Sequence, residues 1–336
     1  MASVKELERI AHEIRIDILK MYYRAGWGHM TPALSCVEIF TALYFGGVMR
    51  MERRFEHDHD WVIMSKGHGC ATWYSCLSRT GYFPHEDLNG FYQAGSKLVG
   101  LASSGVNGVP LPTGSLGHGI CFATGTALAA KRKENAARTY VLLGDGESQE
   151  GSVWEAAMFA GAHGLDNLCV ILDRNGLQAS DRVENITQDT PIRERWEAFG
   201  WHVEECEGHD FPALLRSFSA AKEYAGRSSL IIAHTTKGKG LSFAEAKEDW
   251  HSRAPRGEEW ARACEELGIR VEELERRVRI LSTNLSRTTR ASWRSPQTAE
   301  TVFMSESGLS FLRNTWIMVL RRQIWYLLPQ GLLPAA

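Results

Sequence analysis

The sequence lacks the features that mark membrane-spanning and nucleic-acid-binding proteins. It holds no uninterrupted apolar run of the roughly 18 to 20 residues that a membrane-spanning helix needs. It also lacks a basic excess, because 38 lysines and arginines stand against 40 acidic residues and give a formal net charge of −2. Proteins that bind nucleic acid usually carry such an excess to neutralise phosphates. We therefore expect a protein that binds neither membranes nor nucleic acid.

Paired cysteines are missing as well. The seven cysteines are odd in number and form no C-x-x-C pair, which predicts reduced thiols, most of them small core residues. The first residues, Met1–Glu8, are charged where a signal peptide would be apolar. These features predict a cytoplasmic protein. At 336 residues with 44% hydrophobic side chains, the chain is long enough to bury a substantial core.

Lysine disappears and glycine almost disappears after residue 275. Residues 276–336 contain nine arginines, no lysine, two acidic residues and only two of the chain's 31 glycines. This change predicts a boundary between one domain at residues 1–275 and an Arg-rich tail at 276–336. The arginines interrupt the apolar residues of the tail, so we expect no membrane span there. Two interpretations of the tail stay open: a segment that docks on a partner or a surface, and a non-native extension.

Residues 1–275 alternate apolar runs of strand length with stretches of helical length. The runs lie at 61–64, 139–143, 168–172 and 230–233. Their near-continuous apolar character is typical of strands buried on both faces of a parallel sheet. The helical stretches lie at 7–21, 120–133, 152–163 and 213–225. This alternation predicts an α/β fold with a doubly wound, mostly parallel sheet.

A polar, glycine-bounded segment directly follows the second predicted strand. It reads Gly144-Asp-Gly-Glu-Ser-Gln-Glu-Gly151, so Asp145 stands beyond the carboxyl end of a strand, where open parallel sheets bind ligands. Asn175 follows the next strand, and a turn there would direct the Leu177 carbonyl towards the same place. Carboxylate, amide and carbonyl oxygens, together with phosphate oxygens, suit Mg²⁺. The alternative interpretation is that both segments are ordinary turns.

At these motifs the chain resembles the transketolase family, and the resemblance covers most of residues 5–275. A GDG triplet followed thirty residues later by asparagine is the family's thiamine-diphosphate motif. The other matching blocks, in the family's order, are Ala25–His29 with Pro32, Met64–Gly69, Thr113–Gly119, Ala198–His202 with Gly208–Asp210, and Ala233–Gly240 leading to Trp250-His251. The resemblance implies the thiamine-diphosphate-binding fold. It also implies thiamine diphosphate and Mg²⁺ as cofactors, with Ca²⁺ or Mn²⁺ as alternative ions.

The resemblance assigns roles to individual residues. Asp145, Asn175 and the Leu177 carbonyl would be the metal ligands. The residues implied to be catalytic are His29, His68 and His251, which would face the reacting atoms, and Glu150, a buried glutamate that would couple paired active sites. The residues implied to bind the cofactor are His68, Gly114, Ser115, Leu116, Gly144, Asp145, Gly146, Glu147, Asn175 and His251. Without the motifs, most histidines would be interpreted as solvated or core residues, and Glu150 as the complement of a helix N-terminus.

The family's second domain has no counterpart in the sequence. In transketolases a glutamate on a pyrimidine-binding domain activates the cofactor, and residues 276–336 are too few to form that domain. We therefore expect the chain to be the cofactor-binding subunit of a split, two-component transketolase. Its partner would be a C-terminal subunit that carries the missing domain, in an α2β2 assembly. The pair would transfer a two-carbon ketol unit from a ketose or ketose phosphate to an aldose.

Two departures from the family concern the substrate. Gly100-Leu-Ala-Ser-Ser-Gly105 stands where transketolases have a Gly-His-Pro segment, and His118 stands where glutamine is usual. Loss of a hydrogen-bonding imidazole alters which sugars fit, so we expect a specialised sugar. Other functions stay open: a 2-oxo acid decarboxylase, a deoxyketose-phosphate synthase component, and a non-catalytic regulatory subunit.

Overall fold

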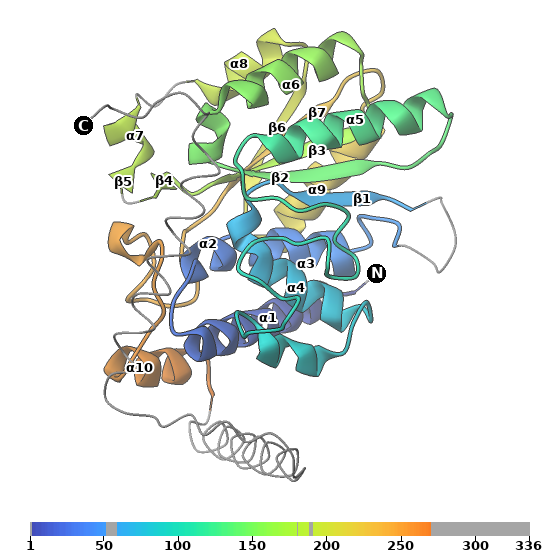
Figure 1. Cartoon of the computed structure of the whole chain (residues 1–336). Helices are drawn as coiled ribbons and strands as arrows, with labels where there is room; N and C mark the ends of the chain where they lie inside the picture. Colours follow the sequence, from blue (N-terminus) through green and yellow to red (C-terminus); the bar gives the residue numbers. More distant parts are fainter. Residues whose placement is uncertain (1, 52–58, 180, 188–190, 270–336) are drawn as a thin grey trace, which may run out of the picture. The chain divides into compact units, whose positions relative to one another are not determined.

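The computed structural model describes residues 2–51, 59–179, 181–187 and 191–269 (Figure 1). The α-helices are α1 (Val4–Ala25), α2 (Met30–Leu34), α3 (Val37–Phe45), α4 (Cys70–Arg79), α5 (His118–Arg132), α6 (Gly151–Ala162), α7 (Val183–Ile186), α8 (Ile192–Ala198), α9 (Phe211–Glu223) and α10 (Glu258–Glu266). The 3-10 helices are η1 (Gly67–Gly69), η2 (His85–Gly90), η3 (Gly146–Gln149) and η4 (Glu248–Trp250). The expected tail at 276–336 lies outside the described residues.

A five-stranded parallel sheet forms the centre of this part of the chain. Its strands are β1 (Trp61–Met64), β2 (Thr139–Gly144), β3 (Leu168–Arg174), β6 (His202–Glu207) and β7 (Ser229–His234). They lie in the order β1-β2-β3-β7-β6, and every neighbouring pair is parallel. A short antiparallel pair, β4 (Leu177–Gln178) and β5 (Asp181–Arg182), stands apart from the sheet. The predicted α/β fold and the four predicted strands are confirmed.

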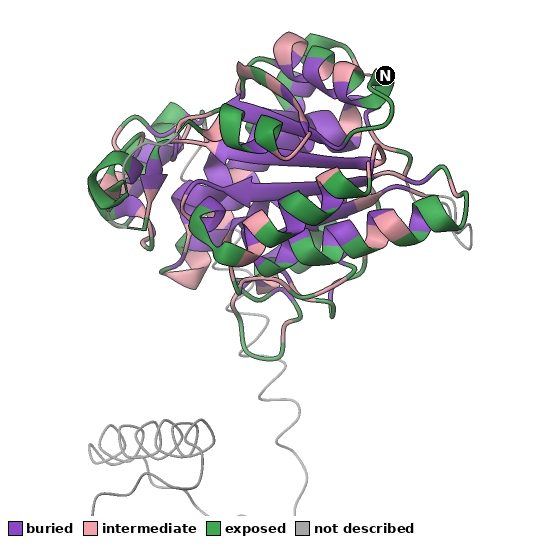
Figure 2. Cartoon of the chain, turned by 90° about the horizontal axis from the view of Figure 1, so that it is seen from above, coloured by how far each residue is buried: buried purple, intermediate pink, exposed green. Residues whose placement is uncertain are grey.

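Helices cover both faces of the sheet, as a doubly wound fold requires. Figure 1 shows α5, α6 and α8 on one side and α1 to α4 on the other. Helix α9 also packs on the second side, where Phe218 meets Tyr140 of β2 edge to face at 6.2 Å. Figure 2 shows the strands buried between helices whose outward faces are exposed. This two-sided burial explains why the central strands are apolar at successive positions.

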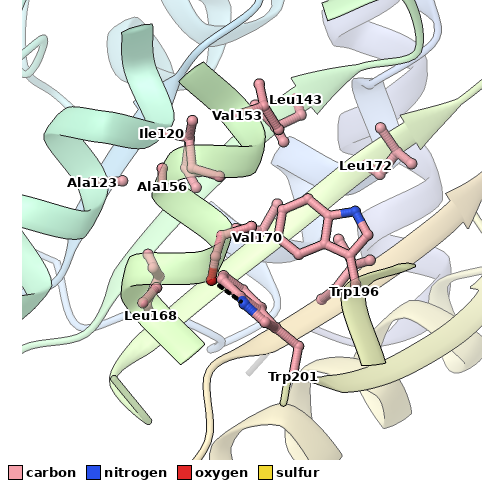
Figure 3. Packing of buried hydrophobic residues seen from close by; sticks show 14 of the residues in the cluster. Ile120, Ala123, Leu143, Val153, Ala156, Leu168, Val170, Leu172, Trp196 and Trp201 are labelled. Carbon is pink, nitrogen blue, oxygen red and sulfur yellow. Dashed lines mark hydrogen bonds between the residues drawn. The ribbon is translucent and has the colours of Figure 1, made fainter. Parts of the chain in front are cut away.

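The core on the α5–α6–α8 side contains branched aliphatic residues and two tryptophans (Figure 3). Trp196 of α8 and Trp201 meet edge to face, with ring centroids 4.6 Å apart. Trp201 Nε1 donates a hydrogen bond of 2.8 Å to the Ala157 carbonyl of α6. The pair thereby joins α6 and α8, because a buried indole N–H must find an acceptor and here it finds one on the neighbouring helix.

Strand β6 is the one strand of the sheet that the sequence did not predict. It lies at the edge, pairs only with β7, and alternates between one buried and several partly exposed side chains. An edge strand has one open side, so it needs no continuous apolar run. The apolar signal that identified the other four strands is therefore absent here.

Two further expectations concern cysteines and membranes. Five of the seven cysteines are buried and all seven are free thiols, as predicted, whereas Cys121 is exposed and Cys206 is half-buried. Within the described part of the chain, no helix is both long and apolar enough to cross a bilayer.

Candidate active site

A cavity of about 440 Å³ opens beyond the carboxyl ends of the central strands. Strands β2 and β3 end at Gly144 and Arg174, so the segments that follow them meet at this edge. Eleven of the predicted site residues line the cavity: His29, His68, Gly114, Leu116, Gly144, Asp145, Gly146, Glu147, Asn175, Leu177 and His251. The fold therefore brings together residues that are more than 200 positions apart in the chain.

Asp145, the carboxylate of the predicted metal site, is fully enclosed by its neighbours. Its Oδ1 accepts from the Arg174 guanidinium at 2.7 Å, and its Oδ2 accepts from the Gly176 backbone N–H at 2.6 Å. Burial raises the pKa of Asp145 above its usual value, and the Arg174 charge offsets only part of that effect. Each carboxylate oxygen keeps a further lone pair with which it can coordinate a cation.

The other two predicted ligands come from the turn after β3. Asn175 Oδ1 accepts from the Leu177 N–H at 3.1 Å, and this bond shapes the turn that places both residues at the cavity. The three predicted ligands are oxygen donors, which suits a hard cation such as Mg²⁺. Among the described residues, no group of three or more histidine, cysteine, aspartate or glutamate side chains is arranged to hold a metal ion. A site here thus depends on one carboxylate, neutral oxygens and the ligand's own oxygens.

Three histidines converge on the cavity from separate loops. The ring centroids of His29, His68 and His251 lie 5.2 to 5.7 Å from one another. Burial, followed by the positive charge of Lys237, lowers the pKa of His251 to about 3 and that of His29 below its usual value. Burial and Lys66 hold the pKa of His68 well below its usual value. All three imidazoles are therefore neutral near pH 7.

Two of these imidazoles have a nitrogen that no described residue satisfies. The Nδ1 atoms of His29 and His251 are buried and have no hydrogen-bond partner among the described residues. A buried polar atom without a partner is costly, so both atoms are suited to a ligand in the cavity. Glycine gives the ligand room as well: a Cβ at Gly114 (φ +138°) would lie 2.8 Å from Leu101 Cδ1. The residues present fit a polar ligand that approaches the backbone closely.

Two buried lysines line the cavity although neither was predicted to belong to the site. Lys66 forms an ion pair with Asp173 and donates to the Pro32 carbonyl at 2.8 Å. Burial would lower the pKa of Lys66, but the Asp173 carboxylate outweighs it and raises that pKa. Lys237 is 2% exposed, and burial and the Lys66 charge lower its pKa to about 8. Both lysines lie in the matching blocks, Met64–Gly69 and Ala233–Gly240, and this was the available signal.

Glu147 holds two glycine-rich segments together beneath the cavity. Its buried carboxylate accepts from the backbone N–H groups of Gly117 at 3.0 Å and Gly144 at 3.1 Å, and from the Ser65 hydroxyl. Burial raises the pKa of Glu147, and these donors offset part of the rise. Its carboxylate therefore organises the walls of the cavity from within the protein.

Two predicted site residues lie outside the cavity. Ser115 is exposed, whereas its neighbours Gly114 and Leu116 line the cavity. Glu150 is also exposed on this chain, which corrects the expectation of a buried glutamate. It occupies the N-cap position of α6 without a side-chain capping bond, so the capping alternative gains no hydrogen bond either.

The loop that carries Lys237 is anchored by a buried charge network. His209 Nδ1 donates to Glu38 at 2.8 Å, and its Nε2 accepts from the Thr236 N–H at 2.8 Å, which fixes the neutral tautomer. Arg15 forms an ion pair with Glu38 at 2.7 Å and also donates to the Lys239 carbonyl at 3.0 Å. The loop therefore has a bonded residue on each side of Lys237.

Comparison with known proteins identifies the family. The profile described as "Transketolase, thiamine diphosphate binding domain" matches residues 7–294, beyond the boundary expected at 275. One subunit of apulose-4-phosphate transketolase is 38% identical in Phocaeicola vulgatus and 42% identical in Actinobacillus succinogenes. These alignments cover 82% and 79% of this chain and 98% and 97% of the relatives.

Solved transketolase structures share the fold. Those from Campylobacter jejuni and Leishmania mexicana match with TM-scores of 0.74 and 0.73, at 32% and 30% identity, over 80% of this chain. The match covers only 43% and 42% of those longer chains. The chain therefore belongs to the transketolase family, as a transferase subunit that carries the thiamine-diphosphate-binding domain.

Proposed function

We propose that the chain binds thiamine diphosphate and Mg²⁺ in this cavity and, with a partner subunit, transfers a two-carbon ketol unit from a ketose to an aldose. The observation that carries the proposal is the meeting of three neutral histidines with Asp145 and Asn175 in one cavity. Asp145, Asn175 and the Leu177 carbonyl would hold the metal ion. His68, His251, Glu147 and the segments Gly114–Leu116 and Gly144–Gly146 would surround the cofactor.

The cofactor, when bound, supplies a nucleophilic carbon and accepts the electron pair that C–C bond cleavage releases. The chain's own residues would position the sugar and handle its protons. The pKa of His251 near 3 makes it a poor base, so it serves best as a neutral hydrogen-bond donor to the substrate oxygen. His29 lies 5.2 Å from it, between ring centroids, and would accept or return the hydroxyl proton.

We propose a specialised sugar as substrate. Leu101 lines the cavity in the segment where transketolases generally have another substrate-contacting histidine. An apolar side chain there supplies no hydrogen bond, so a sugar that depends on one is disfavoured. Named relatives include transketolase subunits for apulose 4-phosphate and for 6-deoxy-6-sulfo-D-fructose. These names support a donor outside the central pentose phosphates.

The partner would be a subunit that carries the pyrimidine-binding domain. Two relatives are named as one subunit of a transketolase, which implies a second subunit in those enzymes. We propose an α2β2 assembly in the cytoplasm, in which residues 1–275 form the domain and exposed Glu150 meets a neighbouring subunit. The tail at 276–336 would dock on that partner or be a non-native extension.

An Asp145→Ala substitution tests the proposal. The chain is purified with its native partner, and ketol transfer is measured with thiamine diphosphate and Mg²⁺. We expect activity to fall by at least about a hundredfold, because the proposed metal site loses its one carboxylate ligand. Asp181→Ala, which removes a partly exposed carboxylate near the same turn, should leave the activity unchanged. A regulatory subunit without catalytic function would be indifferent to both changes.

A further inference from the structure

We propose that Arg174 opposes divalent-ion binding at Asp145, so that the ion binds tightly only together with a diphosphate. The inference rests on the proposed function, because it concerns the same metal site. It gives a role to Arg174, which lies between the predicted ligands Asp145 and Asn175 but was not itself predicted to belong to the site.

The pairing of Arg174 with Asp145 is close and well enclosed. Arg174 Nη1 lies 2.7 Å from Asp145 Oδ1, and the Asp145 side chain is 0% exposed. The Arg174 side chain is 17% exposed and does not line the cavity. Its backbone is fixed in the sheet, because its carbonyl accepts from the Thr235 N–H at 3.0 Å. The guanidinium therefore acts on Asp145 from outside the ligand space and leaves the cavity open.

The charges around the predicted metal site sum to no net negative charge. The positive charge of Arg174 offsets the negative charge of Asp145, and the positive charge of Lys66 is paired with Asp173. The two further charged side chains that line the cavity are Glu147 and Lys237, which carry opposite charges. A dication binds most tightly where anionic oxygens outnumber cations. Without a further anion, the described residues offer it little electrostatic attraction.

A diphosphate would change this balance. Its oxygens are anionic, and Mg²⁺ in proteins is commonly bound through one or two carboxylates plus substrate phosphates. Ion and diphosphate would therefore each raise the affinity for the other, and this coupling is reciprocal. Arg174 strengthens the coupling, because it weakens the binding of the ion alone more than the binding of the neutralised pair.

Mn²⁺ titrations of the purified full chain, followed by electron paramagnetic resonance, test the proposal. Arg174→Gln removes the charge but keeps a hydrogen-bond donor, and we expect it to bind Mn²⁺ alone about tenfold more tightly than the unmodified chain. Arg174→Lys keeps the charge and should stay within about twofold. The matched control is Arg182→Gln, which removes an exposed arginine near the same turn and should also stay within about twofold.

The same titrations with inorganic pyrophosphate present, corrected for the Mn²⁺–pyrophosphate complex, measure the coupling. We expect pyrophosphate to improve Mn²⁺ affinity by a smaller factor in Arg174→Gln than in the unmodified chain. An unchanged or weaker affinity for Mn²⁺ alone in Arg174→Gln would overturn the proposal, because Arg174 would then only orient Asp145. Circular dichroism melts establish that each variant is folded.

Asp145→Asn separates failure of this inference from failure of the proposed function. If Mn²⁺ binding is lost in Asp145→Asn but Arg174→Gln has no effect, the metal site stands and only the role of Arg174 is wrong. If Asp145→Asn binds Mn²⁺ as the unmodified chain does, the metal site itself is wrong, and both proposals fall together.

Discussion

Lys237 is the residue whose charge most directly sets the chemistry of the cavity. It is buried beside the histidines, and its positive charge contributes to the lowered pKa values of His29, His68 and His251. A cation in a poorly solvated site disfavours protonation of its neighbours. The neutral state of the imidazoles is therefore a property of the whole cluster.

A Lys237→Met substitution should raise the pKa of His251 and of His29. The change removes the nearby charge while keeping a long apolar side chain, so the burial contribution remains. NMR titration of the imidazole resonances measures the result. Lys239→Met is the matched control, because Lys239 is a more exposed lysine on the same loop and should leave these pKa values unchanged. Equal titration curves in both variants would contradict the assigned role of Lys237.

His251 also makes stability depend on pH. Its pKa is about 3 in the folded chain against an ordinary 6.5, so between these values the unfolded chain binds more protons. The free energy of unfolding should therefore fall as the pH is lowered from 6.5 towards 3. Urea unfolding at several pH values measures the slope, and His251→Gln should flatten it below about pH 6.5. A slope that is the same in both proteins would show that the His251 pKa is not lowered by folding.

At the scale of elements, the segment from Thr235 to Gly240 positions Lys237. Gly238 adopts φ +83°, donates to the Thr31 carbonyl at 3.1 Å, and would bring a Cβ within 2.5 Å of the Ala244 carbonyl oxygen. The turn thus needs glycine both for its left-handed conformation and for lack of space.

Gly238→Ala should destabilise the chain more than Gly226→Ala does. Gly226 has nearly the same φ, +82°, but nothing lies within 4 Å of its added Cβ. The control therefore costs only the left-handed conformation, about 1 kcal/mol, and Gly238→Ala adds the clash to that cost. Urea unfolding of the two variants gives the comparison. Equal losses of unfolding free energy would mean that the loop yields to the added methyl group.

The elements that could be predicted from sequence are those whose signal is local. Strand β2 is buried at every position, so Thr139–Leu143 reads as a continuous apolar run. Strand β6 could not be predicted in this way, since His202 and Glu204 alternate with buried Val203 at an open sheet edge. Its place is fixed by pairing with β7, which no property of residues 202–207 alone reveals.

The same distinction applies to the site. Asp145 and Asn175 stand at strand ends, where topology alone predicts a ligand, and the family motif supported them. Lys66 was not predicted because lysine is normally exposed, and its burial depends on Asp173, 107 positions away. Glu150 was expected to be buried only through resemblance, and its surroundings on this chain leave it exposed. Features that depend on distant partners or on a neighbouring subunit are the ones that sequence reasoning does not reach.

At the scale of the whole molecule, the chain corresponds to part of a larger catalytic unit. It spans nearly the full length of relatives that are named as one subunit of a transketolase, but only 42% to 43% of two transketolases of known structure. Its cavity gathers the residues proposed to bind the diphosphate and the metal ion, whereas the family's pyrimidine-binding domain is not among the described elements. Catalysis by this chain is thus expected to require a second polypeptide.

The most direct test is ketol transfer by the rigorously purified chain, measured with thiamine diphosphate and Mg²⁺ before and after addition of its stoichiometric partner from the native host. Mass spectrometry identifies the partner in a pull-down with tagged chain. We predict no turnover by the chain alone and cofactor-dependent turnover once the partner is added, with activity saturating at one partner for each chain. Turnover by the chain alone, with no second polypeptide present, would contradict the account.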